Sequence, residues 1–92
     1  MTTNPTTEAM VSLQDSLHTH CLLCGKNHPV GYHLSFDVAE NNGVQAVFDC
    51  EALYQGYTGY LHGGVISAIL DAAMTNCLFA HGKKAVTGLL NI

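Results

Sequence analysis

The stretch GYLHGGVISAILDAAMTN, residues 59–76, brings together the residue types that acyl-transfer chemistry needs. A helix that begins on Gly63 leaves free backbone N–H groups at its positive end, with no side chain in front of them. Such groups can bind a carbonyl oxygen that becomes anionic during acyl transfer. Asp71 supplies a carboxylate that can act on the same carbonyl as general base or nucleophile. Thr75 stands one helical turn later on the same face, where its hydroxyl can orient the carboxylate or a water.

The spacing of these residues predicts a site shared by two copies of the chain. Gly63 and Asp71 are eight residues apart, which is roughly 12 Å along a helix. One reacting carbon must lie roughly 3 Å from both groups, and a single helix cannot arrange this. Two antiparallel copies related by a two-fold axis can bring Gly63 of one copy to Asp71 of the other. We therefore expect an active site here to lie at a homodimer interface.

Each of these residues also has an interpretation without chemistry. A Gly-Gly pair before a helix more often serves the conformation of the loop than an oxyanion hole. A histidine such as His62 more often marks a helix start or packs against its neighbours. The hydroxyl of a helical residue such as Thr75 commonly bonds back to a carbonyl. A lone carboxylate such as that of Asp71 usually has a backbone or hydroxyl partner, because an unpaired buried charge is costly.

A second cluster lies upstream in HTHCLLCGKNH, which holds His18, His20, Cys21, Cys24 and His28. The Cys-x-x-Cys spacing is half of a structural zinc site, to which His20 or His28 could add ligands. The second ligand pair of such a site is missing, and the alternative is a turn with two small buried thiols. The sequence favours packing thiols, and the candidate ligands for a metal are Cys21, Cys24, His20 and His28.

The composition excludes several classes of function. The chain has 92 residues, a formal charge of −4 and no arginine, so it lacks the basic stripe of a nucleic-acid-binding protein. Asp71 and Asn76 interrupt its longest apolar run, which argues against a membrane span. The first residues lack the basic and apolar regions of a signal peptide. We therefore expect a cytoplasmic protein whose four cysteines are free thiols or metal ligands.

Hydrophobic patterning predicts a small α+β domain over residues 12–92, preceded by a flexible arm at residues 1–11. The expected elements are a short helix over 12–19 with Ser12 as N-cap, alternating strands over 33–39 and 44–52 joined by a turn at 40–43, a nearly apolar helix over 63–80 ended by Gly82, and a strand over 85–92. Cys50 and Cys77 fall on faces that we expect to be buried.

The segment YQGYTGYLHGGVISAILDAAMTNCLFAHGKKAVTG resembles the core of hotdog-fold acyl-CoA thioesterases, the branch similar to phenylacetic-acid-pathway thioesterases. The shared features are His-Gly-Gly at His62 and an acid nine residues later. The upstream CLLCGKNHPVGYHLSF is similar to the N-terminal part of many such proteins. The resemblance covers roughly residues 18–92. It implies a long central helix wrapped by an antiparallel sheet, and acyl-CoA hydrolysis in a homodimer or a dimer of dimers.

The resemblance also implies roles for individual residues. Gly63 would offer its N–H to the thioester carbonyl, and Asp71 of the other subunit would act as base or nucleophile. His62 and Thr75 complete the expected catalytic set. The expected substrate-binding residues are Gly64, Gln55, Lys83 and Lys84, with the two lysines directed to the phosphates of coenzyme A. No cofactor is implied.

The sequence departs from the hotdog pattern in length, because family domains continue with further antiparallel strands after the one that corresponds to residues 85–92. We therefore expect a partial hotdog domain whose apolar helix is covered by oligomerisation. The alternative function is a non-catalytic acyl-binding or interaction module. A third interpretation is a small zinc-stapled module built on Cys21 and Cys24.

Overall fold

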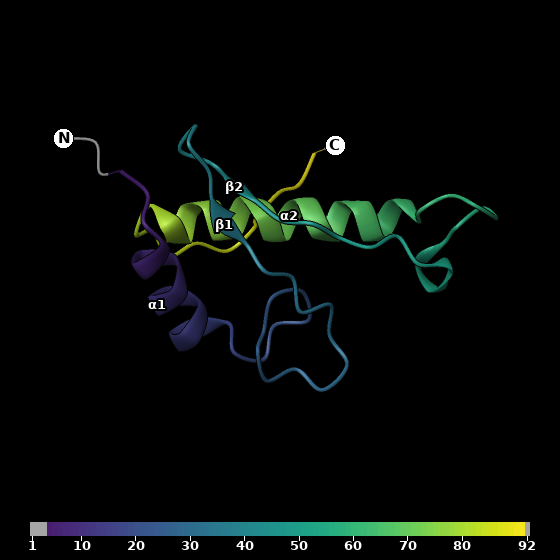
Figure 1. Cartoon of the computed structure of the whole chain (residues 1–92), viewed down its shortest axis with the longest axis horizontal. Coiled ribbons are helices and arrows are strands. Elements are labelled where there is room, and N and C mark those ends of the chain that lie inside the picture. Colours follow the sequence, from purple (N-terminus) through teal and green to yellow (C-terminus); the bar gives the residue numbers. More distant parts are fainter. Residues whose placement is uncertain (1–3, 92) are drawn as a thin grey trace.

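The protein, seen in a computed structural model that describes residues 4–91, has an α+β architecture (Figure 1). Its elements in chain order are α1 (Thr7–Leu17), β1 (Asp37–Val38), β2 (Val44–Gln45), the short 3-10 helix η1 (Ala52–Tyr54) and α2 (Gly63–Ala80). The long helix α2 lies along the molecule, and α1 packs against it near its C-terminal end (Figure 1). The expected α+β class is therefore confirmed.

The bounds of α2 are those that the sequence predicts, and backbone hydrogen bonds close its C-terminus. Gly82 has a φ of 76°, a left-handed conformation that favours glycine. Its N–H donates to the carbonyl of Phe79 (2.9 Å), and the N–H of Lys83 donates to the carbonyl of Leu78 (2.9 Å). This pair of bonds is a Schellman motif, so the prediction that Gly82 ends the helix is confirmed.

The first helix begins earlier than its sequence pattern predicts. The expected helix over 12–19 with Ser12 as N-cap is wrong at its start, because α1 begins at Thr7 and Thr6 is its N-cap. The hydroxyl of Thr6 accepts a hydrogen bond from the N–H of Ala9 (3.1 Å), which satisfies a donor of the first turn. Residues 7–11 of the expected arm are therefore helical, and residues 1–3 lie outside the described residues.

The strands β1 and β2 form the antiparallel hairpin that the sequence predicts, with Asp37 opposite Gln45 and Val38 opposite Val44. Asn42 in the connecting turn has a φ of 66°, a conformation that asparagine tolerates better than most residues. The expected turn at 40–43 is therefore confirmed.

Both strands are much shorter than the expected 33–39 and 44–52. His33 has a φ of 50°, which is incompatible with a strand at that position. On either side of it, the N–H groups of Tyr32 and Leu34 donate to the carbonyls of Leu22 and Leu23 (both 2.8 Å). The start of the expected strand therefore binds the loop after α1 instead of a second strand.

Residues 85–91 contain no strand, so the predicted strand over 85–92 is wrong for the described part of that segment, and residue 92 lies outside it. A strand needs backbone partners on a neighbouring strand, and among residues 4–91 β1 and β2 pair only with each other. The segment is instead anchored by a side chain, because the hydroxyl of Thr87 donates to Oδ1 of Asp71 on α2. With a sheet of two short strands, the finer hotdog assignment is not confirmed.

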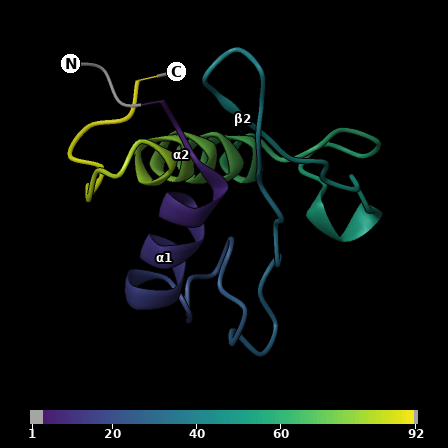
Figure 2. The same cartoon turned by 60° about the vertical axis from the view of Figure 1, so that its left-hand side comes forward.

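The core lies between α1, the second half of α2 and the chain from Cys21 to Phe36 (Figure 2). Its buried hydrophobic residues are Met10, Cys24, Leu34, Phe36, Ala72, Phe79 and Ala80. The buried residues of α2 all come from its second half. The radius of gyration is 13.7 Å, above the about 12 Å expected for a compact chain of this length. Within residues 4–91 the first half of α2 is therefore poorly covered.

One buried polar residue connects the two helices. Asn76 on α2 is fully buried, and its Oδ1 accepts a hydrogen bond from Nε2 of Gln14 on α1 (2.6 Å). Its Nδ2 donates to the carbonyl of Ala72 one turn earlier (2.9 Å). Because both ends of the amide have partners, Asn76 fixes how α1 docks on α2 without leaving an unsatisfied group.

Candidate functional site

The N-terminus of α2 is organised by the side chain of His62. Its Nδ1 accepts a hydrogen bond from the N–H of Gly64 (2.8 Å), so His62 is the N-cap of the helix. Since Nδ1 is the acceptor, the proton of the neutral ring is on Nε2. A Cβ at Gly64 would lie 3.1 Å from Nδ1 of that ring. The second glycine therefore gives the capping ring its space, and the interpretation of His62 as a helix-start histidine has direct support.

The first glycine leaves the chain open where a ligand carbonyl could approach. A Cβ on Gly63 would meet nothing within 4 Å. Its N–H is the first of the helix and has no intrahelical acceptor, and no other group among residues 4–91 accepts from it. A hollow of about 310 Å³ lies here, lined by Gly56, Tyr57, Leu61, His62 and Gly63. An unengaged N–H at a positive helix end, facing a hollow, is suited to a carbonyl oxygen.

The loop before α2 is held by Gln55. Its Oε1 accepts a hydrogen bond from the N–H of Gly59 (3.1 Å), and its backbone forms an isolated bridge with Leu61. Gln55 lines a neighbouring hollow of about 230 Å³ and not the one at Gly63. The side chain of Gln55 therefore stabilises the loop through Oε1. Its amide Nε2 is the group that could donate to a ligand.

Asp71 lies midway along α2, half-buried, with the hydroxyl of Thr87 donating to its Oδ1. Thr75, one turn further on, is also half-buried. Thr87 is a site residue that the sequence did not indicate, because it belongs to a different segment and no spacing connects it to Asp71. The hydroxyl partner is the ordinary way to satisfy a lone helical carboxylate, and it also holds the carboxylate in one orientation.

Gly63 and Asp71 are not brought together within one chain. Both belong to the same straight α2 (Figure 1), where eight residues span roughly 12 Å. Lys83 and Lys84 are exposed beyond the C-terminus of α2, at the opposite end from Gly63 of a helix that is about 27 Å long. A single chain therefore holds the two expected catalytic groups apart, as their spacing predicts.

An exposed apolar row runs along α2 from its first turn to its last. It consists of Ile66, Leu70, Met74 and Leu78, which are 39% to 50% exposed. Despite Asp71 and Asn76, the 18 residues of α2 have a mean hydropathy of 1.4, so by length and composition alone the helix could cross a bilayer. Core helices pass the same test, and α1 packs on the second half of this one.

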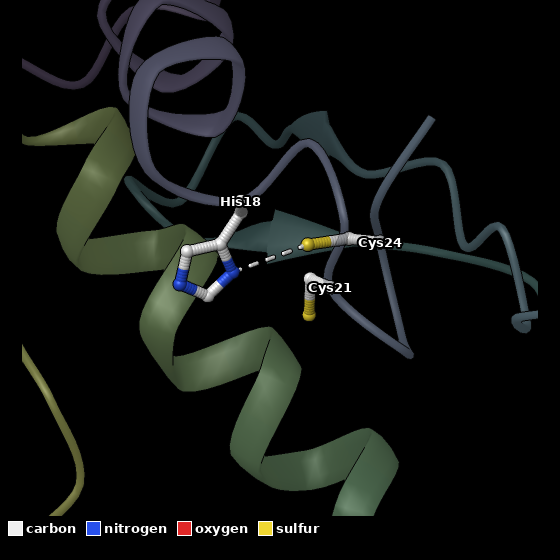
Figure 3. A group of neighbouring side chains, drawn as sticks. All are labelled: His18, Cys21 and Cys24. Carbon is white, nitrogen blue, oxygen red and sulfur yellow. Dashed lines mark hydrogen bonds between the residues drawn. The ribbon is translucent and has the colours of Figure 1, made fainter. Parts of the chain in front are cut away.

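The cysteine–histidine segment forms a cluster with a different histidine from those expected (Figure 3). His18, Cys21 and Cys24 come together, whereas the exposed His20 interacts with Thr19 through Nδ1 (3.2 Å). His28 accepts from the N–H of Val30 through Nδ1 (3.2 Å). His18 stands six residues before Cys24, so its place in the sequence made it a candidate. The structure shows that His18, at the end of α1, is the histidine that lies beside the cysteines.

The cysteines differ in their surroundings. Burial raises the pKa of the Cys24 thiol to about 11, against a hydrogen bond from Asn76 that lowers it, so the free thiol is protonated at neutral pH and is a poor nucleophile. Cys50 is exposed, so the prediction that it lies on a buried face is wrong. The chain around it pairs with no strand, which removes the alternation on which that prediction rested. Cys77 is half-buried.

Comparison with family models, with curated proteins and with solved structures found no match to this chain.

Proposed function

We propose that this chain is an acyl-CoA thioester hydrolase of the hotdog type, with its site assembled between two antiparallel copies of α2. The observation that carries the proposal is the poorly covered first half of α2. It begins with the unengaged N–H of Gly63 at a hollow, and it leads to the hydroxyl-held carboxylate of Asp71. The hairpin beside α2 and the resemblance of the His-Gly-Gly segment support the hotdog architecture.

The spacing of the two groups defines how the copies must meet. If Gly63 of each copy faces Asp71 of the other, the two-fold axis passes beside Ser67, which is midway between them in the sequence. Ile66 then lies beside the axis and Leu70 lies within the overlap of the two helices, whereas Leu78 lies beyond it. The exposed apolar row gives this contact a hydrophobic centre.

The chemistry follows from the two groups. The N–H of Gly63 holds the thioester carbonyl oxygen while Asp71 of the other copy takes a proton from water, whose oxygen bonds to the carbonyl carbon. The carbonyl then re-forms, the carbon–sulfur bond breaks, and the leaving thiolate takes the proton from Asp71. The products are a free acid and coenzyme A. Direct attack by Asp71 through an anhydride gives the same products, and labelled water in a single turnover distinguishes the routes.

The other residues of the candidate site have supporting roles. Thr87 and Thr75 orient the carboxylate or the attacking water. The hydrogen bond from the N–H of Gly64 to the capping ring of His62 keeps the Gly63 N–H in place. Lys83 and Lys84, exposed after α2, remain the candidates for the coenzyme A phosphates.

One observation favours the second candidate, a non-catalytic acyl-binding or interaction module. Asp71 already has a hydroxyl partner in the chain, and such a partner is what a purely structural carboxylate needs. The two functions differ in what a loss of the carboxylate would do, so one substitution separates them.

The test is hydrolysis of a panel of short-, medium- and aryl-acyl-CoA thioesters by the purified chain and by Asp71→Asn, which keeps the shape and removes the charge. The expected loss of kcat is about 100-fold or more. Asp49→Asn is the matched control, because Asp49 is exposed and outside the site, and it should leave the rate unchanged. An Asp71→Asn variant as fast as the parent would reject the hydrolase, and acyl-CoA binding without turnover would establish the second candidate.

A further inference from the structure

His18, Cys21 and Cys24 converge from the end of α1 and the loop that follows it (Figure 3). Their potential ligand atoms all lie within 4.8 Å of one another, and Nδ1 of His18 is 3.7 Å from Sγ of Cys24. Ligands around a tetrahedral zinc ion are about 3.4–3.8 Å apart, given the usual metal–nitrogen and metal–sulfur lengths. We propose that these three residues bind a zinc ion, with the fourth position open to water, and that the ion fastens the end of α1 and its loop to α2.

The loop presents both sulfur atoms to one side before any ion binds. The N–H of Leu23 donates to Sγ of Cys21 (3.4 Å), and the N–H of Gly25 donates to the carbonyl of Cys21 (2.9 Å). A Cβ at Gly25 would lie only 2.4–2.7 Å from backbone atoms of Cys21 and Thr19. The sequence Cys-x-x-Cys-Gly therefore forms a tight turn that requires glycine after the second cysteine, and the turn is what places the two thiols together.

The histidine is held in position by both helices. His18 is the C-cap of α1, where its N–H donates to the carbonyl of Gln14 (2.8 Å). Its ring meets the fully buried ring of Phe79 on α2 edge-on, with centroids 4.9 Å apart and planes at 89°. This packing holds the ring in one plane, with its Nδ1 toward Sγ of Cys24. An ion at this site would therefore connect α1, the loop and the core face of α2.

The donor set suits zinc in type and in charge. The site offers one imidazole nitrogen and two thiolate sulfurs. Zinc binds such ligands in proteins, whereas calcium and magnesium bind oxygen ligands. The charges of the two thiolates cancel that of a divalent ion. The loaded site therefore has no net charge, although one of its ligands, Cys24, is buried. A hollow of about 570 Å³ opens beside the cluster and is lined by Ser16, Leu17, His18, Thr19, His20 and Cys21. We expect a water from this hollow to be the fourth ligand.

A metal at this place also meets a need of the fold. The core is small, with seven buried hydrophobic residues among those described. The loop from His18 to Phe36, which forms one side of this core, contains no helix or strand. Small domains with limited cores commonly rely on a disulfide or a metal. The four cysteines are free, so the metal is the available cross-link.

The test measures bound zinc by elemental analysis after the reduced full chain is equilibrated with zinc chloride and the excess is removed. The parent chain should retain about one zinc per chain, and His18→Ala and Cys21→Ser should each lose at least nine-tenths of it. The matched controls are His20→Ala and Cys50→Ser, which alter the same residue types at exposed positions outside the cluster. Both controls should keep the zinc of the parent.

Cobalt provides a readout that does not depend on the variants being folded. The parent chain loaded with Co²⁺ should show the charge-transfer absorption of thiolate ligands and the visible bands of tetrahedral cobalt. Added zinc should raise the thermal midpoint of the parent and of both controls. A parent chain that retains no zinc, cobalt spectra without thiolate absorption, or loss of zinc in His20→Ala would each overturn the assignment. None of these outcomes bears on acyl-CoA hydrolysis, so the two proposals fail separately.

Discussion

The hydroxyl of Thr87 donates a hydrogen bond to Oδ1 of Asp71, across sixteen residues of sequence and between two different segments. It is the contact that anchors residues 85–91 to α2, and it gives the carboxylate a defined orientation. If Asp71 is structural, this bond only satisfies its carboxylate. If Asp71 is catalytic, the bond also orients the carboxylate toward the substrate. Removing the hydroxyl therefore tests what the orientation is for.

Thr87→Val should slow acyl-CoA hydrolysis by roughly 10- to 100-fold, since hydrogen bonds to charged groups are worth about 1.5–3 kcal/mol. The reduction should appear in kcat, with KM little changed, because the thioester does not contact Thr87 in this arrangement. Val86→Ala is the control, as Val86 is the preceding residue and is 95% exposed. Equal rates for Thr87→Val and the parent would show that the bond has no part in turnover.

The exposed apolar row on α2 predicts where a dimer contact can be broken. Leu70→Glu should turn the dimer into a monomer in light scattering and abolish hydrolysis with it, because a carboxylate inside the contact must be desolvated. Leu78→Glu should do neither, although Leu78 is exposed almost as much, at 39% against 44% for Leu70.

Other partners for this row give different results in the same experiment. If Leu70→Glu and Leu78→Glu remain dimers, the row is not the contact. If the parent is a monomer that sediments with phosphatidylcholine vesicles, the row is a membrane surface and the shared-site account is wrong.

The pairing of Gln14 with Asn76 predicts the stability of the contact between the helices. Gln14→Ala should lower the free energy of unfolding by about 1–3 kcal/mol, because it leaves the carbonyl oxygen of a fully buried amide without a donor. Gln45→Ala, on the exposed side of β2, should change it by less than about 0.5 kcal/mol. Urea denaturation of the three proteins measures the difference, and similar midpoints for all three would mean that the buried amide finds another partner.

Local patterns were sufficient for some elements of the fold. The bounds of α2, its glycine C-terminus and the turn of the hairpin follow from the residues at those positions, and the structure agrees. The lengths of the strands were not predicted correctly from local patterns. Alternating hydrophobicity indicates a half-buried extended chain, but it does not show which strand the chain pairs with. Residues 32–34 bind the loop after α1, and residues 85–91 have no neighbouring strand among the residues described.

The candidate site divides in the same way. Gly63 and Asp71 were predicted as candidates from their types and spacing on one helix, whose geometry is known in advance, and His62 and Gly64 were added by the resemblance. Thr87 comes from another segment, and only the packing of the chain brings it to Asp71. His18 is close to the cysteines in sequence, but the end of α1 decides that it, and not His20 or His28, lies beside them. Sequence spacing predicts contacts within an element and does not predict which distant side chain completes a site.

The shared site is tested most directly by mixing two inactive variants. Asp71→Asn removes the carboxylate, and Gly63→Pro removes the N–H at the first helical position, where proline fits the helix. In a mixed dimer, Gly63 of the first chain faces Asp71 of the second, so one of the two sites is intact. Unfolding and refolding equal amounts together should restore about a quarter of the parent activity by random pairing. Two inactive variants that stay inactive when mixed, while forming mixed dimers, would contradict the account.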